Sequence, residues 1–174
     1  MEALVGVGIA MSFAGNSRPA SGSEHHLSHY FEITGIVTDT EYLTHGIDVA
    51  YSTVKTAEIR EALLKRQWPA VSYRQDSSEY EAAMKEVYHE VAEGCIELQD
   101  KVGHYAADRM PVYLAKEEEI RGILAEHPKA CEIEAMLAAV GMSIDEFYKM
   151  YDAEKIEKAL IYAKDLKDRY TVLW

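Results

Sequence analysis

The chain has 174 residues, of which 48% are hydrophobic and 28% are charged, and its formal net charge is −12. This length and composition are those of a single globular domain over residues 1–174, with enough residues for a sizeable core. The acidic charge argues against nucleic acids and anionic membrane surfaces as partners, because both bind to basic faces. Two cysteines, Cys95 and Cys131, are too few for a disulfide framework and indicate a reducing, cytoplasmic location.

The first predicted element is an apolar stretch over residues 1–15. It contains Glu2 and no basic residue, and it is too short to cross a bilayer, so neither a signal peptide nor a membrane span is expected. Because the stretch is apolar on nearly every face, we predict a helix that packs centrally beside the helix that follows it. A loop rich in Gly and Ser, over residues 15–22, joins the two.

Helical periodicity continues through the rest of the chain. We expect a helix that begins at Ser23, whose hydroxyl can cap it, and a short connection over residues 35–44 that leads to Thr44 as the next cap. Further helices are predicted at residues 45–66, 77–102, 111–127, 131–140 and 153–169, with a loop at 69–76, a kink at Gly94 and a strand-like pattern only at 170–174. The predicted fold class is therefore all-α, a helical bundle.

Four histidines gather near the start of the second and third predicted helices. In a helix, His25 and His29 lie one turn apart on one face, with roughly 6 Å between their Cβ atoms. Together with His45 from the next helix, they could offer imidazole nitrogen atoms to one divalent metal ion. Histidines at this spacing are also common as surface or packing residues, so the spacing alone does not decide the matter.

Other chemistry-bearing patterns are absent from the sequence. It has no G-x-G-x-x-G between a strand and a helix, no P-loop, no C-x-x-C, no H-E-x-x-H and no G-x-S-x-G. The twelve tyrosines are spread over the helices, and we expect most of them to be half-buried packing residues without a catalytic role.

A family resemblance rests on the histidine-rich segment. Residues Ser17–Glu32 (SRPASGSEHHLSHYFE), with Thr44-His45-Gly46, closely resemble the sn-glycerol-1-phosphate dehydrogenases, relatives of the iron-type alcohol dehydrogenases, glycerol dehydrogenases and dehydroquinate synthases. Residues 159–174 are similar to the end of the bacterial members. The resemblance covers the whole chain and implies the helical C-terminal domain of a dehydroquinate synthase-like fold.

The resemblance also implies roles for particular residues. His25 and His45 match the two histidines that hold the catalytic divalent metal, which is usually zinc and in some members nickel or iron. We choose His25 over His26 because the superfamily pattern His-x-x-x-His-x-x-Glu fits His25, His29 and Glu32. His29 then matches a histidine near the substrate, where it would relay a proton.

The implied reaction is reversible hydride transfer between dihydroxyacetone phosphate and sn-glycerol 1-phosphate, with NAD or NADP as cofactor. The family's third metal ligand, an aspartate, and its nicotinamide site belong to an N-terminal α/β half that this sequence does not contain. We therefore expect the C-terminal part of a longer, homo-oligomeric enzyme that acts on a small phosphorylated polyol and is inactive without that half. Arg18, in the loop before the histidines, is placed at the substrate phosphate by its charge alone.

Two alternatives remain open from the residues themselves. The chain could be a self-standing all-helical interaction module with incidental histidines, although a packing helix would carry apolar residues at positions 25, 26 and 29. It could also be a small helical metal-binding protein. That reading would be favoured if Glu24 or Glu32 joined the histidines on one ion.

Overall fold

The computed structural model describes residues 2–70, 77–106 and 108–174, and within these ranges every regular element is a helix. The predicted all-α class is therefore confirmed. The α-helices are α1 (Glu2–Ala14), α2 (Ser23–Thr38), α3 (His45–Lys65), α4 (Ser77–Tyr88), α5 (Ala92–Val102), α6 (Met110–Ala115), α7 (Glu117–Ala125), α8 (Ala130–Ala139), α9 (Ile144–Met150) and α10 (Ala153–Tyr162). Short 3₁₀ helices are η1 (Arg18–Ala20), η2 (His89–Val91), η3 (His104–Ala106) and η4 (Ala163–Leu166).

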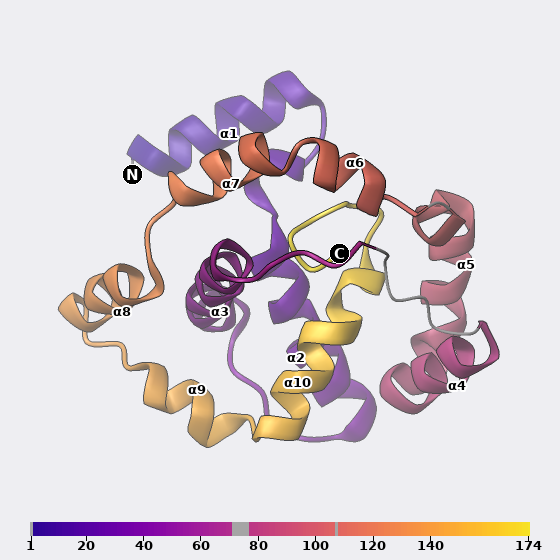
Figure 1. Ribbon diagram of the computed structural model, residues 1–174. Coiled ribbons are helices and arrows are strands. Elements are labelled where there is room, and N and C mark those ends of the chain that lie inside the picture. Colours follow the sequence, from indigo (N-terminus) through magenta and orange to yellow (C-terminus); the bar gives the residue numbers. More distant parts are fainter. Residues whose placement is uncertain (1, 71–76, 107) are drawn as a thin grey trace.

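Helix α2 is the centre of the fold (Figure 1). It packs against α3, α4, α10 and η4, while α3 also contacts α7, α8 and α9. Segments from the two ends of the sequence therefore meet on α2, and its N-terminal turns carry the histidine-rich segment.

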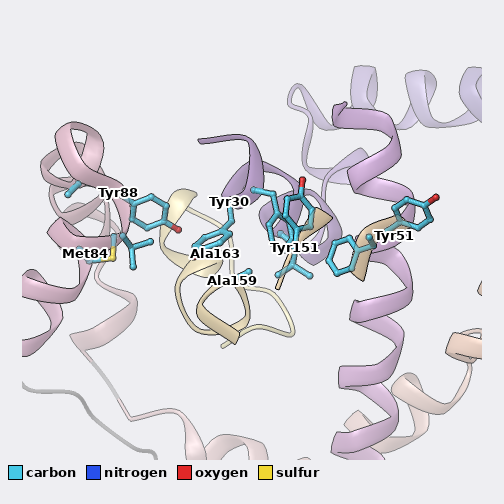
Figure 2. Close-up of a cluster of buried hydrophobic side chains, with 12 residues drawn as sticks. Tyr30, Tyr51, Met84, Tyr88, Tyr151, Ala159 and Ala163 are labelled. Carbon is cyan, nitrogen blue, oxygen red and sulfur yellow. The ribbon is translucent and has the colours of Figure 1, made fainter. Parts of the chain in front are cut away.

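Aromatic side chains make up much of the core around α2 (Figure 2). The ring of Phe31 stacks on Tyr151 with 4.0 Å between the ring centroids, and it meets Phe147 edge-on at 5.3 Å. Four tyrosines are at most 2% exposed, namely Tyr30, Tyr51, Tyr88 and Tyr151. They are more deeply buried than the half-buried positions expected from the sequence, because each belongs to one shared aromatic cluster rather than to a helix surface.

Helix α1 forms as predicted, but its predicted central packing is wrong. None of its described residues is buried, and Leu4 and Phe13 are 73% and 89% exposed. The helix lies at the periphery (Figure 1), and its main contact is with η1. An apolar helix is buried only when neighbours surround it, and the described part of this chain places its core around α2 instead.

Several helix ends differ from the prediction because tertiary contacts decide them. Gly22 is the N-cap residue of α2, and the Ser23 hydroxyl instead accepts a hydrogen bond from the backbone amide of Val172 at 3.2 Å. The helix continues past Gly35 to Thr38 and ends at Asp39, which has a φ of 52°.

The longer predicted helices are divided. The break in 77–102 comes at η2, where His89 has a φ of 48°, and not at Gly94. The helix predicted over 111–127 divides at Lys116, and the last helix ends at Tyr162 and continues as η4. Residues 170–174 contain a turn and no strand, and positions 71–76 of the predicted loop lie outside the described residues. Among the described helices, none combines the length and apolar character that crossing a bilayer would require.

Candidate metal centre

The first turns of α2 and α3 bring three imidazole rings together. The ring centroid of His45 lies 5.4 Å from that of His25 and 4.9 Å from that of His29, and the rings of His25 and His29 are 6.4 Å apart. Two imidazoles on one tetrahedral zinc ion, each with a Zn–N bond of about 2 Å, have ring centroids about 5 Å apart. The spacing of these rings therefore fits a shared divalent ion.

Glu32 adds a carboxylate to this group. Its Oε2 lies 3.3 Å from Nδ1 of His29 and 3.8 Å from Nδ1 of His45. One ligand atom from each of His29, Glu32 and His45 lies within 4.8 Å of the others. Two histidines and a carboxylate are a common zinc donor set. The structure thus offers two overlapping ligand sets, the predicted His25 and His45, and a second set that includes Glu32.

Neighbouring polar groups fix the orientation of the rings. Nδ1 of His25 lies 2.9 Å from Oε1 of Glu24, which also accepts the backbone N–H of Gly22 at 2.8 Å. The Ser28 hydroxyl lies 3.1 Å from Nδ1 of His45 and donates to the His45 carbonyl at 3.3 Å. A partner on one ring nitrogen leaves the other free to face a ligand, which is how metal-binding histidines are usually oriented.

The electrostatic environment favours a neutral His29. Burial lowers the pKa of His29, the interactions with Lys167 and His45 lower it further, and Glu32 partly opposes them. Burial alone would raise the pKa of Glu24, but its hydrogen bonds to His25 and Gly22 outweigh burial and lower it. These directions favour a neutral imidazole at His29 and an ionised carboxylate at Glu24, which are the forms of these groups that bind a divalent cation.

His26 is not part of the imidazole group. Its side chain is completely buried, and neither ring nitrogen has a hydrogen-bond partner among the described residues. Burial, with the nearby charges of Lys167 and Arg169, lowers its pKa to about 4. The structure therefore places His26 on the interior face of α2, whereas His25 and His29 lie on the face toward His45.

The structure does not bring Arg18 into contact with the histidines in the described part of the chain. Its guanidinium donates to Oδ2 of Asp168 at 2.8 Å, and the Arg18 side chain is 60% exposed. The charge that suggested a phosphate contact is therefore already paired with a carboxylate.

Asp48 is a residue beside the site that the sequence did not single out. It lies one turn after His45, is completely buried, and accepts from the Tyr151 hydroxyl, whose oxygen lies 2.9 and 3.0 Å from the two carboxylate oxygens. The Tyr151 oxygen in turn accepts the backbone N–H of Leu43 at 3.0 Å. Burial raises the pKa of Asp48 to about 7, and the negative charge of Glu32 adds to the rise. Its position one turn from His45 was the only signal in the sequence, because the partner lies 103 residues away.

Comparison with known proteins gives matches along the entire chain. Proteins named glycerol-1-phosphate dehydrogenase (NAD(P)+) from Geobacillus thermodenitrificans and Bacillus licheniformis are 29% and 26% identical over 175 aligned positions, which cover 100% and 99% of this chain. A protein of the same name from Korarchaeum cryptofilum is 47% identical over 60 residues, which are 34% of this chain and 19% of that protein. The resemblance drawn from the histidine-rich segment is thereby confirmed.

The chain is much shorter than these relatives. It spans 37% of the Geobacillus protein and 32% of the Bacillus protein. No protein-family model matches the chain, and no solved structure matches it.

Proposed function

We propose that this chain supplies the metal- and substrate-binding helical part of an NAD(P)-dependent sn-glycerol-1-phosphate dehydrogenase. Such an enzyme interconverts dihydroxyacetone phosphate and sn-glycerol 1-phosphate. The observation that carries the proposal is the gathering of His25, His29 and His45, in a chain that is similar along its entire length to dehydrogenases of that name.

His25 and His45 are the proposed ligands of a divalent metal, with zinc first and nickel or iron as alternatives. The ring spacing and the lowered pKa of the neighbouring His29 support this assignment. When bound, a divalent ion supplies Lewis-acid polarisation of a carbonyl or alkoxide oxygen. His29, one turn along the same face, is proposed to hold and pass the proton of the substrate hydroxyl, for which a half-buried imidazole next to Glu32 is suited.

The nicotinamide cofactor is assigned to no residue of this chain. A dinucleotide site of the Rossmann type needs a strand, a Gly-rich turn and a helix, and the described residues contain no strand. We therefore assign hydride transfer to the nucleotide-binding part of a longer protein and expect this chain alone to be inactive. The homo-oligomeric state and the cytoplasmic location remain predictions; the unpaired state of Cys95 and Cys131 supports the latter.

A second candidate function is a helical metal-binding protein that completes its site from its own residues. The position of Glu32, within 3.8 Å of both His29 and His45, favours it. In that case the ligands are His29, Glu32 and His45, and His25 is dispensable.

Zinc binding by single-residue variants separates the two candidates. The affinity of the chain for zinc is measured by competition with a chromophoric chelator, for His25→Ala, His45→Ala and Glu32→Gln, with the exposed His127→Ala as the control. The dehydrogenase proposal expects weak binding that is lost in His25→Ala and His45→Ala and is retained in His127→Ala. Loss that follows Glu32→Gln and spares His25→Ala would support the second candidate instead.

The activity test uses glycerol 1-phosphate and NAD(P)+. The chain alone should produce no NAD(P)H, and the chain joined to the remaining part of the Geobacillus thermodenitrificans relative should produce it. The joined protein with His25→Ala should be inactive. Activity in that variant would contradict the assigned role of His25.

A further inference from the structure

The proposed substrate carries a phosphate group, and Lys167 is a cation that makes no ion pair in the described part of the chain. Arg18, the residue first considered, is bound to Asp168. Lys167 follows η4, and its ammonium group lies 3.2 Å from the Ser21 hydroxyl. Within residues 2–70, 77–106 and 108–174, no carboxylate oxygen comes within 4.0 Å of this ammonium group.

Lys167 faces the histidine-bearing end of α2. Its ammonium group lies 3.2 Å from the hydroxyl of Ser21, two residues before α2 begins, and α2 packs against η4, the element that precedes Lys167. The Lys167 side chain is only half-exposed; burial and the charge of Arg169 lower its pKa, and the charge of Glu24 partly opposes them. A partly desolvated ammonium group binds an oxyanion more strongly than an exposed one, because less water screens the attraction.

The backbone that carries Lys167 is held in place from the opposite side. The buried Gln99 side chain of α5 donates to the carbonyl oxygens of Asp165 at 2.9 Å and Lys167 at 3.0 Å. The Tyr105 hydroxyl donates to the Asp165 carboxylate at 2.6 Å. Two elements distant in sequence therefore fix the position of Lys167, as expected for a preorganised binding group.

Arg169 adds a second positive charge close to Lys167. Arg169 donates to the Ser21 carbonyl at 2.9 Å and the Ser17 hydroxyl at 3.0 Å. Its Nε is buried and makes no hydrogen bond, although Oδ1 of Asp168 lies 3.9 Å away. Both ring nitrogens of His26 are also buried without a partner in the described structure. Buried polar atoms nearly always have a partner, and this corner holds unpartnered atoms of both kinds, since Oε1 of Gln99 and Oδ2 of Asp165 also make no hydrogen bond among the described residues.

We propose that Lys167, backed by Arg169 and the loop over residues 17–21, binds the phosphate of a small phosphomonoester whose other end reaches His25, His29 and His45. The identity of the whole substrate rests on the proposed function. The oxyanion site itself is inferred from the contacts of Lys167 alone. An ammonium group at this position acts as a point charge for phosphate, while the adjacent Ser21 hydroxyl offers a further hydrogen bond.

The test is titration calorimetry on the metal-free chain, with inorganic phosphate, glycerol 1-phosphate and glycerol as separate probes. The chain should bind the two phosphates and not glycerol. Lys167→Met should weaken phosphate binding by about tenfold or more, as expected for a lost charged hydrogen bond. Lys65→Met is the matched control, because it makes the same change in net charge at a side chain on α3 that is 77% exposed. If Lys167→Met does not fold, as judged by its circular dichroism, Lys167→Gln is measured in its place.

Two results would overturn the proposal. One is a metal-free chain that binds neither phosphate at millimolar concentration. The other is equal phosphate binding by the wild-type chain and the Lys167 variant. If Arg18→Met then abolishes binding, the phosphate is held by Arg18 and not by Lys167. Failure of the proposed function gives a different result. If the chain binds phosphate through Lys167 but binds no zinc at His25 and His45, the metal assignment is refuted and the phosphate site is not.

Discussion

Replacing Asp48 with asparagine should remove a pH-dependent contribution to stability. The wild-type carboxyl group is completely buried beside the Tyr151 hydroxyl, and burial raises its pKa from 3.8 to about 7. Asparagine has nearly the same volume, keeps a carbonyl oxygen for the Tyr151 hydroxyl, and carries no titrating proton.

The sign and size of the effect follow from proton linkage. The folded protein binds the Asp48 proton more tightly than the unfolded chain, so this group stabilises the fold fully below pH 3.8, and the contribution is lost as the pH rises to about 7. A rise of about three pKa units corresponds to about 4 kcal/mol at most. The free energy of unfolding of Asp48→Asn, minus that of the wild type, should therefore increase by a few kcal/mol, about 4 at most, between pH 4 and pH 8.

The assay is urea unfolding followed by circular dichroism at several pH values in this interval, with a chelator present. The difference between variant and wild type is used because His26, whose pKa is lowered to about 4, titrates in the same interval with the opposite sign and cancels in the difference. Asp100→Asn, at an exposed position on α5, serves as the control and should give a nearly constant difference. A difference for Asp48→Asn that is equally constant from pH 4 to pH 8 would refute the reasoning.

Two further substitutions test contacts that hold α3 in place. Tyr151→Phe removes the hydroxyl that serves both Asp48 and the Leu43 amide, and it should lower the free energy of unfolding by about 1–3 kcal/mol, which urea unfolding measures. Arg121→Met removes guanidinium bonds from α7 to the carbonyl oxygens of Leu63 and Leu64 at the end of α3, with an expected loss of about 1–3 kcal/mol by the same measurement. A loss below about 0.5 kcal/mol in either variant would show that solvent replaces these bonds at little cost.

The sequence by itself determined the elements and one face of the site. Helical periodicity is local, since it depends on residues three or four positions apart, and it correctly predicted an all-α chain. The same spacing placed His25 and His29 on one side of a single helix, and the structure has both rings there, 6.4 Å apart. The histidine-rich segment also carried the resemblance that the comparisons confirm.

Tertiary structure alone decided which groups distant in sequence meet near the histidine-bearing helices. Tyr151 is hydrogen-bonded to Asp48, 103 positions away in the sequence, and Lys167 is hydrogen-bonded to Ser21, 146 positions away. Local spacing carries no information about such pairs, because they depend on how the whole chain packs around α2. The same reason explains the wrong prediction for α1. Its sequence indicates an apolar helix, but whether a helix is buried depends on what packs around it, and the described residues place their aromatic core elsewhere.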